Sequence, residues 1–175
     1  MEPRTSPHSV RNYVFRKNHD TNKWFIFLVY SSMAQAWYAP GGTNQEFPFE
    51  TPEETGLREI REEVRDDIEI YEYVVFDESP QPDGHKRYSL LIIEVGGFPE
   101  LGEKTLNYEY NTERVATDSL RGCWIEVNQK LFTLFKGPRG AIMTKALGML
   151  AYIDPEFRND YCGDVKIFTD LEKAL

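Results

Sequence analysis

The sequence has few cysteines and no long apolar run. Only Cys123 and Cys162 occur, far apart and without CxxC spacing, so neither a disulfide framework nor a zinc signature is indicated. The opening residues MEPRTSPHSV lack the apolar core of a signal peptide, and no uninterrupted apolar run approaches the roughly 18 residues of a transmembrane helix. We therefore expect a cytoplasmic protein with no membrane-spanning segment.

Basic residues are also scarce. The chain has 20 Lys and Arg against 29 Asp and Glu, a formal net charge of -9. A field of this sign repels the phosphate backbone of nucleic acid and disfavours long nucleic acid as a partner. Divalent cations can invert the sign locally at a carboxylate cluster, so a small anionic ligand remains compatible. The sequence does not indicate the oligomeric state.

Length and composition fit one folded domain. Of the 175 residues, 41% are hydrophobic and 28% are charged. A chain of this length and composition can bury a core without disulfide bonds or structural metal ions. We expect residues 1–10 to be a flexible lead-in and residues 11–175 to form a single domain. Apolar patterns predict strands and helices in an order typical of a mixed β-sheet covered by helices, an α/β fold. The strands are expected at 13–17, 24–30, 68–76, 87–95 and 124–127, the helices at 51–67 and 140–153, and a long loop at 96–120.

The helix from residue 51 has the clearest sequence signal. Thr51 is a predicted N-cap, Pro52 suits the first helical position, and Glu54 completes a capping box. Apolar residues then recur at spacings of three and four, which predicts one face packed on a sheet. These residues are Leu57, Ile60, Val64 and Ile68.

Four carboxylates share another face of this helix. Glu59, Glu62, Glu63 and Asp66 stand at i, i+3, i+4 and i+7. Like charges at these spacings destabilise a helix by about 0.2–0.5 kcal/mol per pair unless a cation lies among them. Hard oxygen ligands on one rigid face suit Mg²⁺ or Mn²⁺. The competing interpretation is a solvated acidic face partly neutralised by arginines of the same helix.

The spacing of these residues resembles the Nudix box, G-x5-E-x7-R-E-U-x-E-E-x-G-U, where U is a bulky apolar residue. The preceding AWYAPGG is similar to the strand and glycine turn that lead into the box. The sequence departs from the box in its loop and at its end: seven residues separate Gly42 from Glu50 where the box has five, and Arg65 and Asp66 stand where the box has its last glycine and apolar residue. A surface loop can absorb the insertion. The matched positions are Glu50, Arg58, Glu59, Ile60, Glu62 and Glu63.

The resemblance implies a Nudix-type α/β/α sandwich with a mixed sheet. It implies that Glu59, Glu62 and Glu63 bind Mg²⁺ or Mn²⁺ and supply the general base, and that a backbone carbonyl at Gly41 contributes to the metal site. Arg58 and Glu50 would form the supporting ion pair. The implied activity is a pyrophosphohydrolase acting on a diphosphate linkage in a nucleoside diphosphate derivative. The alternative is a non-catalytic module that binds or senses a nucleotide.

Several residues outside the box are candidates for further roles. An additional acid often completes the metal site in the family, and the sequence does not choose between Glu113 and Asp118. Lys136 and Arg139 precede a predicted helix, whose N-terminus favours anions. Arg87 follows the Asp83-Gly84 turn and is a candidate for contacting a substrate phosphate. A solvated turn or hairpin tip is the competing interpretation for all three basic residues.

Overall fold

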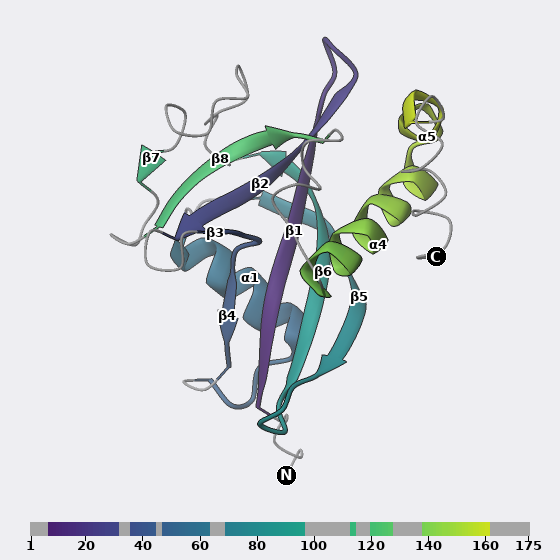
Figure 1. The fold of residues 1–175 in the computed structure, drawn as a ribbon. Coiled ribbons are helices and arrows are strands. Elements are labelled where there is room, and N and C mark those ends of the chain that lie inside the picture. The colour runs from purple at the N-terminus through teal and green to yellow at the C-terminus, as the bar shows by residue number, and fades with distance from the viewer. Residues whose placement is uncertain are drawn as a thin grey trace. The chain divides into compact units, whose positions relative to one another are not determined.

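The computed structural model of the chain contains one mixed β-sheet and three helices among the described residues (Figure 1). The described residues are 7–31, 36–44, 47–63, 69–96, 113–114, 120–127 and 138–161. Contacts divide the chain into two compact units, residues 1–16 with 25–125, and residues 17–24 with 126–175. That residues 11–175 form a single domain stays a prediction.

The sheet mixes parallel and antiparallel pairs, as the sequence predicts. Within the described residues it has eight strands in the order β5-β6-β1-β2-β8-β7, with β3 paired to β2 and β4 paired to β1. β1 runs parallel to β6 and antiparallel to β4, and β5 is antiparallel to β6. The strands are β1 His8–Asn18, β2 Lys23–Ser31, β3 Ala36–Tyr38, β4 Gly41–Thr43, β5 Glu69–Pro80, β6 Lys86–Gly96, β7 Glu113–Arg114 and β8 Leu120–Glu126.

Helix α1, Pro52–Glu63, begins where the capping box predicts. The N–H of Glu54 donates to Oγ1 of Thr51 at 3.2 Å, and the N–H of Thr51 donates to the Glu54 carboxylate at 3.4 Å. These reciprocal bonds satisfy donors that a helix start leaves without intrahelical partners. The predicted continuation of the helix to Asp67 lies outside the described residues.

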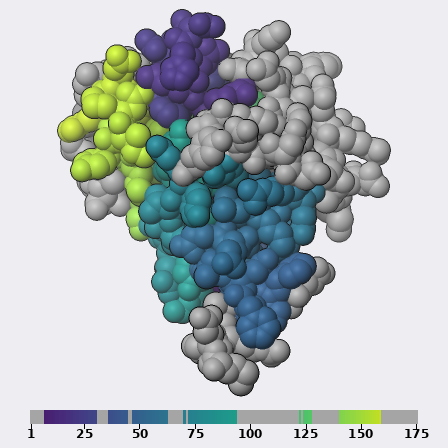
Figure 2. All heavy atoms as spheres, turned by 180° about the vertical axis from the view of Figure 1, so that it is seen from behind, coloured from purple at the N-terminus to yellow at the C-terminus, as the bar shows by residue number. Residues whose placement is uncertain are grey.

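The core of the first unit lies between α1 and the sheet. Ile60 is fully buried there, and α1 contacts β4, β5 and β6. The other side of α1 reaches the surface, where Figure 2 shows the segment containing it in blue. The buried cluster consists of Val10, Val14, Phe25, Phe27, Val29, Ile60, Leu90, Ile92 and Trp124.

Strand β1 begins at His8, inside the segment expected to be a lead-in. The N–H of His8 donates to Oδ1 of Asn44 at 2.8 Å, and the N–H of Asn44 donates to the His8 carbonyl at 3.1 Å. β1 also pairs with β6 from His8 onward. Polar residues are therefore buried here by hydrogen bonds and strand pairing, which an apolar pattern does not detect.

The strands predicted at 68–76 and 87–95 are confirmed as β5 and β6, which pair as an antiparallel hairpin and extend further toward the turn than expected. Gly84 has a φ of 87°, a left-handed conformation that favours glycine in the turn. In contrast, β7 falls within the expected loop. It pairs with β8, which begins at Leu120 rather than Trp124. A two-residue strand shows no periodicity, so only its tertiary pairing reveals it.

The second unit contains α4, Pro138–Ile153, and α5, Pro155–Tyr161. Asp154 joins the two helices and accepts hydrogen bonds from Nζ of Lys17 at 3.0 Å and Nε1 of Trp24 at 2.7 Å. Burial would raise the pKa of Asp154, but these hydrogen bonds outweigh it and hold the pKa below its usual value. The sequence did not predict α5. None of the described helices has the length and apolar character needed to cross a membrane.

Candidate functional site

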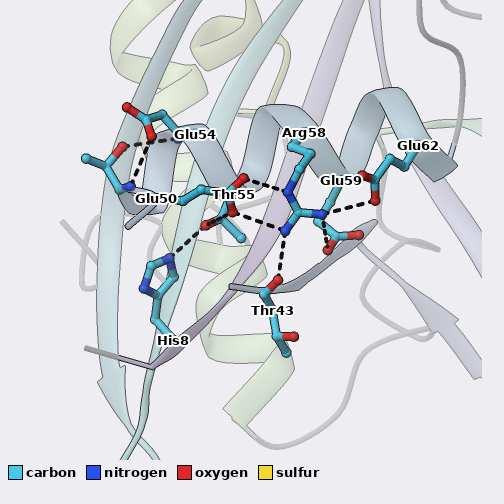
Figure 3. Close-up of polar contacts among 9 residues, drawn as sticks. His8, Thr43, Glu50, Glu54, Thr55, Arg58, Glu59 and Glu62 are labelled. Carbon is cyan, nitrogen blue, oxygen red and sulfur yellow. Dashed lines mark hydrogen bonds and ion pairs between the residues drawn. The ribbon is translucent and has the colours of Figure 1, made fainter. Parts of the chain in front are cut away.

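The guanidinium of Arg58 is at the centre of the polar network on α1 (Figure 3). Nε donates to Oε1 of Glu50 at 2.7 Å, and Nη2 donates to Oε2 of the same carboxylate at 3.1 Å. The two side chains are only 17% and 15% exposed. A two-point contact of this kind fixes orientation as well as distance. It ties the loop that carries Glu50 to the helix.

The remaining donors of Arg58 bind three further oxygens. Nη1 donates to Oε1 of Glu59 at 3.1 Å and to Oε2 of Glu62 at 3.0 Å, and Nη2 donates to the carbonyl of Thr43 at 2.9 Å. Burial alone would lower the pKa of Arg58, but the surrounding carboxylates raise it above its usual value. A permanently charged guanidinium therefore gathers two glutamates of the helix beside β4.

The pKa of the Glu59 carboxyl is raised above its usual value. Burial raises the pKa of Glu59, Arg58 opposes this rise, and the neighbouring Glu62 reinforces it. The net direction is upward, so Arg58 does not fully compensate the cost of ionising this side chain. An additional cation at Glu59 would stabilise the ionised form.

Two glycines allow β4 to lie this close to its neighbours. A Cβ on Gly42 would lie 2.1 Å from Cδ of Glu59, and a Cβ on Gly41 would lie 1.8 Å from the carbonyl oxygen of Val10. Gly42 therefore makes room for the Glu59 carboxylate, and Gly41 makes room for β1. That the carbonyl of Gly41 binds a metal stays a prediction.

Two buried residues, Thr55 and His8, extend the hydrogen-bond network beyond Glu50. The hydroxyl of Thr55 donates to Oε2 of Glu50 at 3.1 Å, and Nε2 of His8 lies 2.9 Å from the same hydroxyl oxygen. A hydroxyl has one proton. Because the carboxylate accepts it, the Thr55 oxygen accepts from His8, whose ring proton must be on Nε2. His8 and Thr55 are 3% and 0% exposed.

The outer side of α1 carries a surface depression of about 530 Å³ beside Arg58. The ring of Phe47 faces the Arg58 guanidinium, with 4.5 Å between the guanidinium carbon and the ring centroid. Phe47 belongs to the loop that is longer than the Nudix box requires, so this loop contributes to the network around Arg58. The depression is lined by Glu54, Leu57, Arg58, Arg61 and Glu62.

The structure brings together Glu50, Arg58, Glu59 and Glu62 but leaves other predicted residues undecided. Glu63 is the last residue of α1, and its side chain lies outside the described part of the chain. Arg87 is on β6, where it pairs in register with Ser9 of β1. The side chains of Glu113 and Arg139 also lie outside the described part of the chain, as do Asp118 and Lys136 as a whole.

Sequence reasoning missed several members of the network. Gly42, Thr43 and Phe47 precede the helix, and the glycine pair was the only signal for them. Thr55 is a polar residue on the buried side of α1, which is an unusual placement that a helical projection can reveal. His8 is 47 residues from Thr55 in the chain, and no local pattern connects them.

The carboxylates of the network suit a divalent cation. Arg58 contacts one oxygen each of Glu59 and Glu62, which leaves each carboxylate a second oxygen outside this contact. Among the described residues, no group of three His, Cys, Asp or Glu side chains is already assembled as a metal site. Mg²⁺ commonly takes only one or two carboxylates and completes its shell with water and phosphate oxygens. Two glutamates at one face therefore fit such an ion.

Substituting the two glycines by alanine should have different effects. Gly41→Ala places a methyl group against rigid backbone and should destabilise the fold by about 1–3 kcal/mol. Gly42→Ala meets the end of the Glu59 side chain rather than backbone, so the loss of stability should be smaller, below about 1 kcal/mol, while the carboxylate is displaced from Arg58. Urea denaturation of both variants measures the change in the free energy of unfolding. Equal losses of stability would contradict the roles assigned to these glycines.

Thr55→Val should destabilise the protein, since it leaves His8 and Glu50 each without this hydrogen bond. The expected loss is about 1–3 kcal/mol, the cost of a buried polar group left unpaired. Thr55→Ser keeps the hydroxyl and should retain most of the stability. Denaturation curves compare the variants, and nitrogen NMR of His8 checks that Nε2 carries the proton. A Thr55→Val protein as stable as wild type would show that the hydrogen bonds of Thr55 with His8 and Glu50 contribute nothing to the free energy of unfolding.

Comparison with known proteins relates this fold to solved structures. The sequence matches no protein-family model and no curated protein. A structure from work on MutT of Aliivibrio salmonicida and Vibrio cholerae has a TM-score of 0.53 and 18% identity, and the match covers 80% of this chain and 94% of that one. An Ap4A hydrolase of C. elegans in a binary complex has a TM-score of 0.55 and 15% identity, and the match covers 83% of this chain and 98% of that one.

A Listeria monocytogenes protein assigned to the NUDIX hydrolases has a TM-score of 0.51 and 16% identity, and the match covers 77% of this chain and 87% of that one. Identities at this level relate the folds and leave the activity open. The family resemblance of the sequence and the structural similarity agree. This chain therefore has the α/β fold of the Nudix hydrolases.

Proposed function

We propose that this chain is a Nudix pyrophosphohydrolase that uses Mg²⁺ or Mn²⁺ to hydrolyse a diphosphate linkage in a nucleoside diphosphate derivative. The observation that carries the proposal is the gathering of the Glu59 and Glu62 carboxylates by Arg58, which Glu50 holds in turn. These four residues occupy the spaced positions of the Nudix box, so sequence and geometry support the same site.

Glu59, Glu62 and Glu63 would hold the metal, together with a backbone carbonyl at Gly41. When bound, Mg²⁺ or Mn²⁺ neutralises charge on the phosphate oxygens and lowers the pKa of a bound water. The raised pKa of Glu59 supports its assignment to this set, because a cation relieves the cost of ionising a partly buried carboxylate.

The chain's own residues position these ligands and move the proton. Arg58 restrains Glu59 and Glu62, and the contacts from Glu50, Thr55 and His8 restrain Arg58 in turn. Small displacements of catalytic groups have large effects on rate, so this rigidity serves the reaction. One glutamate of the set accepts the proton of the attacking water. The water oxygen bonds to phosphorus as the bridging oxygen leaves with the departing phosphate group.

We expect the substrate to be a small nucleotide rather than long nucleic acid. The net charge of -9 opposes a polyanionic chain, whereas a metal site admits a compact phosphate group. The C. elegans relative is named as an Ap4A hydrolase, which makes dinucleoside polyphosphates reasonable members of a test panel. Lys136 and Arg139 remain proposed substrate contacts.

A nucleotide-sensing module is the second candidate. It is favoured by Arg65, which stands where the Nudix box has its last glycine. Such a module would bind the same ligands on the same fold without turnover. Metal-dependent turnover, rather than affinity, separates the two functions.

The direct test is product release from a panel of nucleoside triphosphates, dinucleoside polyphosphates and nucleotide sugars with Mg²⁺ and with Mn²⁺. Glu59→Gln keeps the size of the side chain but removes its charge, and should reduce turnover at least about 100-fold. Glu53→Gln, in the first turn of the same helix, is the matched control and should keep wild-type turnover.

The outcome of this assay separates the candidates. Wild-type protein that binds nucleotides without turning them over under either metal would support the sensing module. Turnover that persists in Glu59→Gln would remove this glutamate from the proposed site.

A further inference from the structure

Three residues between Gly42 and the start of α1 contact the guanidinium of Arg58. The carbonyl of Thr43 accepts a hydrogen bond from Nη2 at 2.9 Å, and the carboxylate of Glu50 accepts two, at 2.7 and 3.1 Å. Between these two residues in the chain is Phe47, whose ring centroid lies 4.5 Å from Cζ of Arg58. The connection from β4 to α1 therefore meets the same guanidinium at three points.

The contact with Phe47 differs in kind from the hydrogen bonds of Arg58 (Figure 3). A guanidinium is planar and has five N–H donors, and Arg58 makes five hydrogen bonds. Their partners occupy the edge of the plane. A ring centred 4.5 Å from Cζ therefore lies against a face of the guanidinium, where no N–H points. The hydrogen-bond partners are Thr43, Glu50, Glu59 and Glu62.

Backbone hydrogen bonds fix the position of Phe47. Its N–H donates to the carbonyl of Asn44 at 3.0 Å, and its carbonyl accepts from the N–H of Glu50 at 3.0 Å. Asn44 is buried and exchanges two hydrogen bonds with the backbone of His8 on β1. Phe47 is thus tied to the sheet through Asn44 and to the ion pair through Glu50.

Burial in the core does not explain where this ring lies. Phe47 is 44% exposed and is not part of the buried cluster between α1 and the sheet, whereas the side chain of Arg58 is 17% exposed. An aromatic ring attracts a cation placed over its face. A ring over the guanidinium also keeps water from that face, which strengthens the charged hydrogen bonds around it.

The length of the connection makes this contact possible. Seven residues separate Gly42 from Glu50, where the Nudix box has five, and Phe47 is one of the seven. Both ends of the stretch are fixed, since Gly42 pairs with β1 and Glu50 binds Arg58. A longer connection between fixed ends lets the chain pass over the guanidinium. The departure from the box therefore has a structural use in this chain.

We propose that Phe47 is a positioning residue of the site, because its ring keeps the plane of Arg58 oriented so that Nη1 points to Glu59 and Glu62. The role of these carboxylates in turnover rests on the function proposed above, whereas the restraint on Arg58 does not. Phe47 acts through Arg58 and does not contact the substrate. Without the ring, the guanidinium tilts and water reaches its face.

The first test is NMR of the metal-free protein, in which exchange of the Arg58 Nε proton with water is measured. Phe47→Leu keeps an apolar side chain but removes the ring, and should accelerate this exchange at least about threefold. Phe47→Tyr retains the ring and should restore the wild-type rate. Phe49→Leu is the matched control, the same substitution two residues away at a phenylalanine that is 66% exposed, and should leave the rate within about twofold of wild type.

The second test compares kcat and KM for a substrate that the wild type hydrolyses. Phe47→Leu should lower kcat by about three- to tenfold, the effect of one cation–π contact, and leave KM within about twofold. Phe47→Tyr should restore kcat, and Phe49→Leu should have neither effect. A loss confined to kcat and rescued by another aromatic ring is the signature of positioning.

Two results would overturn the proposal. Unchanged proton exchange at Arg58 in Phe47→Leu would show that the ring does not restrain the guanidinium. A raised KM with unchanged kcat would instead place Phe47 in contact with the substrate. A wild-type protein without turnover would reject the hydrolase, and the exchange rates would still decide whether Phe47 restrains Arg58.

Discussion

The candidate site depends on one guanidinium. Arg58 contacts Glu50 in the loop, the Thr43 carbonyl on β4, and Glu59 and Glu62 on its own helix. Without it, two acidic side chains one turn apart would repel each other and adopt separate rotamers. With it, loop, strand and helix share a charged hydrogen-bonded centre in which Arg58, Glu50 and Glu59 are largely withdrawn from water. Burial nevertheless raises the pKa of Glu59 in spite of Arg58, so a further cation beside it would favour the ionised carboxylate.

The rest of the fold keeps this guanidinium in place. Ile60 anchors the opposite side of α1 in the core, and the capping box fixes where the helix begins. His8 and Thr55 hold Glu50 through hydrogen bonds in the interior. Gly42 lets β4 approach the helix closely enough for the Glu59 carboxylate to lie against its backbone. Each contact is modest alone, but together they position Arg58 between Glu50 and the carboxylates of Glu59 and Glu62.

Local sequence patterns predicted the elements that carry strong local signals. The capping box located the start of α1, and apolar runs on either side of the Asp83-Gly84 turn located β5 and β6. The carboxylate face and its resemblance to the Nudix box predicted the pairing of Glu50 with Arg58. Long-range contacts were not predictable. The start of β1 at His8, the two-residue β7 and the contact between His8 and Thr55 depend on residues far apart in the chain.

The measurement that tests the central claim most directly is a crystal structure of the protein grown with Mn²⁺, with the metal located by its anomalous scattering. We predict a manganese ion coordinated by carboxylate oxygens of Glu59 and Glu62, with Arg58 still bound to Glu50. Manganese bound elsewhere, with both glutamates held only by Arg58, would contradict it.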